Sequence, residues 1–319
     1  MKKTIEKFKG KKIGVIGDLM VDHYMQGDVE RISQEAPTPI LALREETYVL
    51  GGAANVAANI AALGGYPHII GTRGDDMPGK ILLKELKKKG ILSDGILRDA
   101  AKPTVEKIRV ISLQHQMLRI DREDKTSISS MLQKKILEEV SAHITEWDAL
   151  IISDYAKGML TPVLIRMIIS LSRRHKKPLI ADTKPDNFSF FKNVAVITPN
   201  KKEAEEIAGK KIVTEKDAGY VGRVLQKKIH SAVLITRGME GATLFEAKAI
   251  RHFSARDVEI ADVTGAGDTL LAALALGIAA GASLRDACFI ANFAAGLVVE
   301  KRHTATVSYD ELNAVLHEK

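Results

Sequence analysis

The residues best suited to chemistry lie in the segment Asp262 to Asp268, which reads D-V-T-G-A-G-D. The segment after it, Thr269 to Ala282, is largely apolar and has the length of a buried helix. We therefore expect Gly265, Ala266 and Gly267 to form a tight turn where this helix begins. Glycine lets the backbone approach a ligand closely, and the first amides of a helix have no partner inside it and favour an anion.

Asp268 allows two interpretations. Its side chain can cap the predicted helix, which is a purely structural use. Alternatively, its carboxylate can accept a proton from a substrate hydroxyl. Transfer of a phosphoryl group to a hydroxyl would use both features, because the amides would stabilise the migrating anion while Asp268 takes the proton. The segment by itself leaves both interpretations open.

Polar residues recur where the predicted strands end. Short apolar runs at 13–16, 149–152, 179–181 and 194–197 alternate with helical patterns, which is typical of a parallel sheet. The runs are followed in order by Asp18, Asp154, Asp182 and Asn200. Because the carboxyl ends of parallel strands share one edge of a sheet, we expect these side chains to lie close together.

The segments around Asp18 and around Asn55 each have both a functional and a structural interpretation. The loop expected after the first strand carries Asp18 and Asp22, which can accept hydrogen bonds from sugar hydroxyls or serve turn chemistry. Gly51-Gly52-Ala53-Ala54-Asn55 precedes a helix predicted over 56–63. Asn55 can both donate and accept, which suits a polyol, but an ordinary loop-to-helix junction is the alternative.

Asn200 and Glu203 also have two uses. Asn followed three residues later by Glu is a variant of the helix capping box. The same two side chains can serve Mg²⁺, directly or through its waters. The residues alone favour the capping box. Further along, 233–245 predicts a hairpin whose loop runs from Arg237 to Gly241.

Strand patterns near 38–50 and 104–121 predict a small sheet outside the main one. Such a sheet would form a lid that covers a substrate and excludes water. Lys107, Arg109 and Arg119 lie in the second region, and their charges suit a phosphate already on the substrate. The alternative is that these charges protect edge strands from aggregation.

The composition excludes several function classes. The 319 residues carry a net charge of +7, but the lysines are spread out and not interleaved with aromatics, so we expect no nucleic-acid partner. A single cysteine, Cys288, excludes an intrachain disulfide and a Cys-type zinc site, and it favours the cytoplasm and a role in the core. No signal peptide or membrane span is expected, and the absence of a linker predicts one domain over 1–319.

Two nucleotide-binding motifs are incomplete. Gly74 to Lys80 matches the first seven positions of a P-loop, but Ile81 stands where a Ser or Thr must bind Mg²⁺. We interpret it as a strand-to-helix loop. The chain has no G-x-G-x-x-G, which disfavours an NAD-linked oxidoreductase.

Two signatures, G-G-A-A-N-V-A and D-V-T-G-A-G-D-T, make the chain resemble the ribokinase-like (PfkB) carbohydrate kinases over nearly its full length. The resemblance implies a three-layer α/β sandwich with a mostly parallel central sheet and a small β-sheet lid. Within the family, the chain is similar to the kinases of D-glycero-β-D-manno-heptose 7-phosphate. The segments that carry this are G-D-L-M-V-D-H-Y, R-I-S-Q-E-A-P-T-P, L-G-G-A-A-N-V-A-A-N and I-I-S-D-Y-A-K-G.

The resemblance implies roles for matching positions. Asp268 would be the catalytic base, and the amides of Gly265, Ala266 and Gly267 would form the anion hole. The sugar would contact Asp18, Asp22, Gly51, Gly52, Asn55 and Asp154, and its phosphate Lys107 and Arg109. The cofactor ATP would lie near Lys184, Thr236, Arg237, Gly238 and Gly241. Asn200 and Glu203 would serve Mg²⁺, which reverses the preference for a capping box.

The resemblance also implies a homodimer formed through the lid, and it leaves K⁺ activation open. A kinase of ribose, fructose or a fructose phosphate would share the same site. A non-catalytic sugar- or nucleotide-binding regulator is an alternative of another class, although it would have no need of Asp268. Some heptose kinases are fused to a cytidylyltransferase; this chain has no H-x-G-H, so we expect a stand-alone enzyme or one domain of a bifunctional protein.

Overall fold

The computed structural model describes residues 1–113, 115–301 and 303–317. Its strands are β1 (Lys12–Gly17), β2 (Leu19–Ile32), β3 (Pro39–Gly52), β4 (Tyr66–Arg73), β5 (Ile96–Arg98), β6 (Val105–Ser112), β7 (His115–Arg122), β8 (Ala149–Ser153), β9 (Leu179–Asp182), β10 (Val196–Ile197), β11 (Ala232–Thr236), β12 (Ala242–Phe245) and β13 (Ile250–Phe253).

The α-helices are α1 (Lys2–Glu6), α2 (Ala53–Ala62), α3 (Met77–Lys88), α4 (Ser130–His143), α5 (Pro162–Arg174), α6 (Lys201–Ala208), α7 (Glu215–Ile229), α8 (Ala266–Ala279), α9 (Leu284–Val298) and α10 (Tyr309–His317). Two 3-10 helices, η1 (Pro185–Phe190) and η2 (Gly238–Glu240), complete the described elements. None of these helices is both long and apolar enough to cross a bilayer.

The main sheet, over the described residues, has nine strands in the order β13-β12-β11-β10-β9-β8-β1-β4-β5. Its pairs are parallel from β11 to β5, whereas β12 and β13 are antiparallel. The β11–β12 pair confirms the predicted hairpin. Because β1, β8, β9 and β10 run in the same direction, their carboxyl ends do share one edge, as the sequence predicted.

Helices cover both faces of the main sheet, which gives three layers. Side chains alternate between the faces of a strand. Ile13 and Val15 of β1 therefore belong to the core under α2, α8 and α9, and Ile16 belongs to the core under α4, α5 and α7. The α/β class with a large, mostly parallel sheet and a separate smaller sheet is confirmed.

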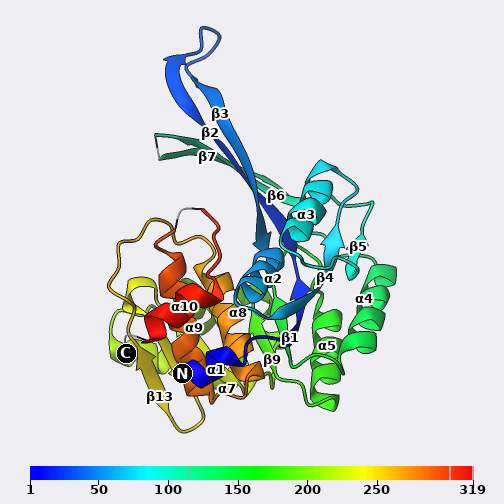
Figure 1. The fold of residues 1–319 in the computed structure, drawn as a ribbon, viewed down its shortest axis with the longest axis vertical. Coiled ribbons are helices and arrows are strands. Elements are labelled where there is room, and N and C mark those ends of the chain that lie inside the picture. The colour runs from blue at the N-terminus through cyan, green and yellow to red at the C-terminus, as the bar shows by residue number, and fades with distance from the viewer. Residues whose placement is uncertain (114, 302, 318–319) are drawn as a thin grey trace.

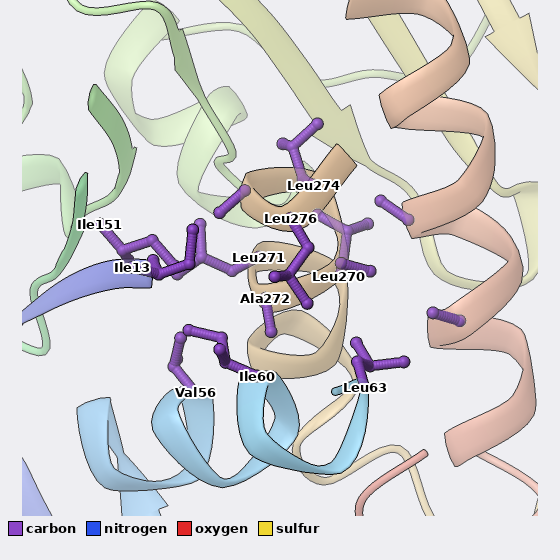
Figure 2. Packing of buried hydrophobic residues seen from close by; sticks show 14 of the residues in the cluster. Ile13, Val56, Ile60, Leu63, Ile151, Leu270, Leu271, Ala272, Leu274 and Leu276 are labelled. Carbon is purple, nitrogen blue, oxygen red and sulfur yellow. The ribbon is translucent and has the colours of Figure 1, made fainter. Parts of the chain in front are cut away.

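Helix α8, whose first turn carries Asp268, lies in the middle of the first core. Figure 2 shows Leu271 of α8 on the side of Ile13 of β1, with Val56 and Ile60 of α2 below the helix. On its far side α8 meets α9 so closely that a Cβ on Gly277 would lie 2.9 Å from that of Ala287. A helix buried on all sides has little freedom to move, so it is a rigid support for its first turn.

The second sheet has the order β3-β2-β6-β7 over the described residues and extends away from the body (Figure 1). It contains both predicted lid regions, and a further strand that the sequence reasoning missed. The prediction of a loop after β1 is wrong, because β2 begins at Leu19 and Asp22 lies within this strand. The first six residues of β2 are all buried, so they lack the alternation that marks a half-exposed strand.

The order of the lid strands also settles one alternative. Lys107 and Arg109 lie on β6, which pairs with β2 on one side and β7 on the other. They are therefore not edge-strand residues, and the edge-protection interpretation is wrong for this pair. Arg119 does lie on an edge strand, β7, where its side chain pairs with Asp121.

The incomplete P-loop segment and Cys288 both have structural roles in the fold. In the incomplete P-loop segment, Asp76 caps α3 by accepting from the amide of Gly79 at 3.0 Å and also binds Thr104, which confirms a strand-to-helix loop. Cys288 of α9 is fully buried, and burial raises the pKa of its thiol well above the ordinary range. It is core filler, as predicted.

Candidate active site

Asp268 lies in the first turn of α8 and does not cap the helix. The N-cap is Gly265, at φ +83°, and no side chain caps this helix end. Instead, the two carboxylate oxygens of Asp268 accept separate hydrogen bonds, from the Tyr155 hydroxyl at 2.7 Å and from the Asn55 amide at 2.8 Å. The capping interpretation of Asp268 is therefore wrong.

The carboxylate of Asp268 remains able to accept a further proton donor. Burial raises the pKa of Asp268 to about 6, although the bonds from Asn55 and Tyr155 lower it. The group is therefore ionised near neutral pH. Each carboxylate oxygen has two acceptor sites, and one is used on each oxygen here. A substrate hydroxyl can thus bind beside the existing partners.

Asn55 is held by a polar network between α2 and α8. Its side-chain oxygen accepts from the Asn59 amide at 3.3 Å, and Asn59 in turn accepts from the Thr269 hydroxyl at 2.9 Å. Asn55 and Asn59 are four residues apart, so they share one face of α2. The sequence assigned Asn55 to the sugar; the structure places its amide on Asp268, and the sugar contact stays a prediction.

The turn before α8 is open at Gly267, but one of the three amides predicted to bind an anion, that of Ala266, already has a partner. Gly265 adopts a left-handed conformation, and a Cβ there would be 3.0 Å from the Asn55 amide nitrogen. Gly267 has open space where a Cβ would stand, with nothing within 4 Å. The Ala266 amide donates to Val263 at 3.3 Å, a long bond in a turn. The exposed helix entrance at Gly267 leaves room for an oxyanion.

Tyr155 is a site residue that the sequence reasoning did not single out. Its hydroxyl bonds Asp268, and the ammonium groups of Lys107 and Lys184 lie 5.4 and 5.2 Å from its ring centroid. Such distances suit cation–π attraction. The phenol therefore links the base to one lysine from the lid and another from the strand-end edge. The only signal in the sequence was its position after Asp154.

The carboxylates at the strand ends affect one another's protonation. Burial raises the pKa of Asp182 to about 8, with a further contribution from Glu203 and smaller ones from Asp268 and Asp154. Lys184 pairs with Glu203 and opposes this effect. A bound cation would relieve the remaining repulsion. Oxygen is the ligand type that Mg²⁺ prefers, although within the described residues these carboxylates do not form a group of three ligand atoms within 4.8 Å of one another.

Asp154 already has protein partners on both oxygens. It accepts from the Ala156 amide at 2.9 Å, the Thr183 hydroxyl at 2.8 Å and the Asn187 amide at 2.9 Å. These bonds hold the loops after β8 and β9 together. Its assignment to the substrate remains a prediction.

The predicted nucleotide residues lie at the ends of β10 and β11. Asn200 and Glu203 do form a capping box, with bonds of 3.0 and 2.9 Å. Thr236 forms a bridge with Asn200, so the two strand ends are adjacent. The capping box does not exclude contact with a metal-bound water, because each carboxylate oxygen has more than one acceptor site.

Arg237 is engaged by the protein itself. Its guanidinium is buried and pairs with Glu215 and Glu240. Gly238 and Gly241 have φ of +60° and +85°, and a Cβ on Gly241 would lie 2.0 Å from the Phe253 carbonyl oxygen. These contacts shape the hairpin turn, and proximity to a nucleotide remains a prediction for all three positions.

On the lid side, Arg109 forms an ion pair with Asp22. The guanidinium also lies 5.2 Å from the ring centroid of Tyr24, whose hydroxyl is 3.2 Å from that of Thr304. Asp22 accepts from Thr304 at 3.3 Å. The pair fixes Arg109 in place, but it also means that a phosphate must share Arg109 with Asp22.

A cavity of about 530 Å³ lies between the lid and the loop before α8. Its walls include Tyr24, Arg44, Arg109, Asp262, Thr264 and His303. The wall carries the guanidinium groups of Arg44 and Arg109 and also the carboxylates of Asp28, Glu45 and Asp262, so it offers charges of both signs. The cavity is therefore the place where lid and body can both contact one molecule.

Asp18 organises the loop after β8. Its carboxylate accepts from the backbone amides of Tyr155, Lys157 and Met159 at 2.9, 3.2 and 3.4 Å. Burial raises the pKa of Asp18 to about 6, with a contribution from Asp154, while the three amides lower it. The structure thus brings Asp18 to the predicted strand-end edge, and its sugar contact remains a prediction.

Gly51 and Gly52 allow β3 to pass close to Asp22 of β2 and to Asp18, which lies between β1 and β2. A Cβ on Gly51 would lie 2.7 Å from Oδ2 of Asp22, and a Cβ on Gly52, whose φ is +56°, would lie 2.6 Å from the Asp18 carbonyl oxygen. Both glycines therefore permit a close contact within the protein, and their contact with a sugar remains a prediction.

Comparison with known proteins agrees with this geometry. A family model described as pfkB family carbohydrate kinase matches residues 11–311. Among similar curated proteins, the bifunctional protein HldE of Caulobacter sp. (strain K31) is 42% identical over 313 residues, which cover 97% of this chain and 64% of that protein. HldE of Helicobacter pylori (strain J99) is 38% identical over 309 residues, with 97% and 67% covered. The chain thus spans about two thirds of the length of these relatives.

Solved structures show the same fold at low identity. Phosphofructokinase-2 from Escherichia coli in complex with potassium superposes with a TM-score of 0.79 at 18% identity, covering 97% of this chain and 99% of that one. Ribokinase from Arabidopsis thaliana, complexed with ribose and ATP, gives 0.76 at 18% identity with the same coverage. The ribokinase-like fold is confirmed, and the chain belongs to the pfkB family of carbohydrate kinases.

Proposed function

We propose that this sugar kinase transfers the γ-phosphoryl group of ATP to the anomeric hydroxyl of D-glycero-D-manno-heptose 7-phosphate and gives the 1,7-bisphosphate, a precursor of ADP-heptose and the lipopolysaccharide core. The observation that carries the substrate assignment is the position of two basic lid residues, Lys107 and Arg109, around the network of the predicted base. A sugar that already bears a phosphate needs such charges. The similarity to HldE proteins supports the same choice.

The base in this proposal is Asp268. Phosphoryl transfer has a loose transition state, so the protein mainly positions the reactants and stabilises charge. Asp268 takes the proton of the attacking hydroxyl, and the bonds from Asn55 and Tyr155 keep its carboxylate in one orientation. The acceptor loses its proton late, so a carboxylate whose pKa is about 6 suffices.

The helix entrance and the strand-end edge serve the other reactant. The amides around Gly267 donate to the oxygens of the migrating phosphoryl group, where negative charge develops. Asn200 and Glu203 are the residues we assign to Mg²⁺, with Asp182 nearby. When bound, Mg²⁺ neutralises charge on the phosphates of ATP. Lys184 lies between Glu203 and Tyr155 and completes the positive side of the site.

The proposal is tested by a phosphoryl-transfer assay over candidate sugars. We expect the highest kcat/KM with heptose 7-phosphate, compared with ribose, fructose and fructose 6-phosphate. A ³¹P NMR spectrum of the product should show a second phosphate at the anomeric carbon. A higher kcat/KM for fructose 6-phosphate or an unphosphorylated sugar would replace the proposed substrate while keeping the kinase.

We also propose that two copies of the chain associate through their lids. Every residue of β7 is exposed, and Met117, Leu118 and Ile120 are each about half exposed. An apolar strand open to water on an edge is a pairing surface. Sedimentation of the wild-type chain should show a dimer, and Leu118→Lys should shift it toward the monomer. A monomeric wild-type chain at all concentrations would contradict the lid interface.

A further inference from the structure

A second cluster of ligand-type side chains lies outside the kinase site. His68 of β4 contacts Glu139 of α4, with 3.2 Å between Nε2 and Oε1. His143, one helical turn after Glu139, contacts the same oxygen through its Nε2 at 3.3 Å. Within the described residues, these three form a group whose ligand atoms all lie within 4.8 Å of one another.

The spacing of these atoms matches a tetrahedral metal site. With metal–nitrogen and metal–oxygen bonds of about 2.0–2.1 Å, neighbouring ligand atoms of a tetrahedron lie roughly 3.3 Å apart. Two of the three edges in this cluster already have that length. The third edge, between the two imidazoles, is at most 4.8 Å long and would have to shorten to this length if it is longer.

The surroundings hold the two imidazoles in place. The ring of His68 meets that of His143 edge-on with centroids 4.5 Å apart, and it packs against buried Trp147 at 5.4 Å. Trp147 is itself fixed, because its ring fills the space beside Gly14, where a Cβ would lie 2.5 Å from it. The cluster is therefore preorganised.

The charges around the cluster also suit a cation. Nδ1 of His143 faces the carboxylate of Glu146 at 3.6 Å, and Glu146 pairs with Lys12 at 3.3 Å. A carboxylate on the ring nitrogen that does not bind the metal is the usual outer contact of a metal-ligating histidine. Both imidazoles approach the same oxygen of Glu139, at 3.2 and 3.3 Å.

We propose that His68, Glu139 and His143 bind one Zn²⁺ ion, and that this ion stabilises the contact between α4 and the main sheet. Two imidazoles and a carboxylate favour Zn²⁺ over Mg²⁺, which prefers oxygen ligands. The three side chains are partly exposed, so water can fill the fourth position. His68 pairs with Gly14 of β1, three residues before the strand end, so the site is separate from Asp268 and independent of the proposed function.

The test is a calorimetric titration of the full, tag-free chain with ZnCl₂ after treatment with a chelator, in buffer with excess Mg²⁺ to occupy oxygen-ligand sites. We expect one ion per chain. His143→Gln should weaken binding about tenfold or more, because it removes a ligand. His115→Gln removes an exposed histidine of β7 on the lid and should bind as the wild type does.

A thermal melt gives a second readout. Zn²⁺ should raise the midpoint of the wild type and of His115→Gln, because an ion that binds only the folded state stabilises it, and should not raise that of His143→Gln. If His143→Gln folds poorly, Glu139→Gln tests the same site with an unchanged side-chain shape. The proposal is overturned if the wild type shows no saturable binding, or if His143→Gln and Glu139→Gln bind Zn²⁺ as tightly as the wild type does.

Discussion

The central strand β8 and the lid strand β7 belong to the same chain but have opposite environments. All five residues of β8 are buried, whereas all eight residues of β7 are exposed. The body supplies its own partners for every face of its sheet, as Figure 1 shows by the helices on both sides. The lid does not cover strand β7 with other parts of the chain, so the surface of this strand is open to a partner molecule.

We expect this difference in burial to give the body and the lid different roles in the proposed reaction. The proposed base Asp268 and the turn before it are attached to α8, one of the most buried helices, which suits groups that must be rigid. Lys107 and Arg109 come from the lid, where we propose that they contact the phosphate of the substrate. We therefore expect body substitutions to change turnover or stability, and lid substitutions to change substrate affinity or assembly.

The largest effect is expected for Asp268→Asn in the body. The amide retains the size of the side chain but cannot accept the proton, so kcat should fall by at least about a hundredfold. Binding of ATP and sugar, measured by calorimetry, should change little. Near-normal turnover would remove Asp268 from the mechanism. Asp76→Asn is the control, because it weakens the cap of α3 and should lower stability with little change in kcat.

A pair of leucines tests the contrast in packing. Leu271→Ala in α8 opens a cavity in a fully buried position and should lower the free energy of unfolding by about 2–5 kcal/mol at every protein concentration. Leu118→Ala on β7 is half exposed and should cost roughly 0.5 kcal/mol or less in the monomer. Urea unfolding curves measured at several protein concentrations check both values. If the lid dimerises, only the Leu118 effect should grow with concentration.

Lys107→Ala tests the lid side of the site. Loss of a charged hydrogen bond to phosphate should raise KM for the sugar phosphate about tenfold or more while KM for ATP stays close to that of the wild type. Arg119→Ala is a matched control on the same sheet, since its charge pairs with Asp121. Equal increases for both substrates would point to a change in folding or assembly.

The alternation of strands and helices could be predicted from the sequence, because each buried strand is a short apolar run that ends in a polar residue such as Asp18 or Asp154. The turn around Gly265 could be predicted for the same reason: two glycines and an aspartate precede an apolar helix. Strand β2 could not, because its first half is buried on both faces and the remainder is polar, so no single period marks it.

The partners of the site residues could not be predicted from the sequence either. Tyr155 is 113 positions from Asp268, and Asn55 is 213 positions away. Only the fold shows that their side chains converge on one carboxylate. The same holds for Arg109 and Asp22, which suit different ligands as single residues but neutralise each other on adjacent strands.

The smallest expected effect concerns the hydrogen bond from Tyr155. The base must be ionised, so kcat/KM of the wild type should fall as the pH drops through about 6, the pKa of Asp268. The Tyr155 hydroxyl lowers that pKa by donating to the ionised form, so Tyr155→Phe should move the acidic limb upward, by roughly one pH unit. At pH 8, well above both values, the two enzymes should differ little. A kcat/KM profile over pH distinguishes this from a general structural defect, which would lower kcat/KM at every pH and leave the limb where it was. If the acidic limb of the profile stays in place in Tyr155→Phe, the hydrogen bond from Tyr155 does not set the pKa of Asp268.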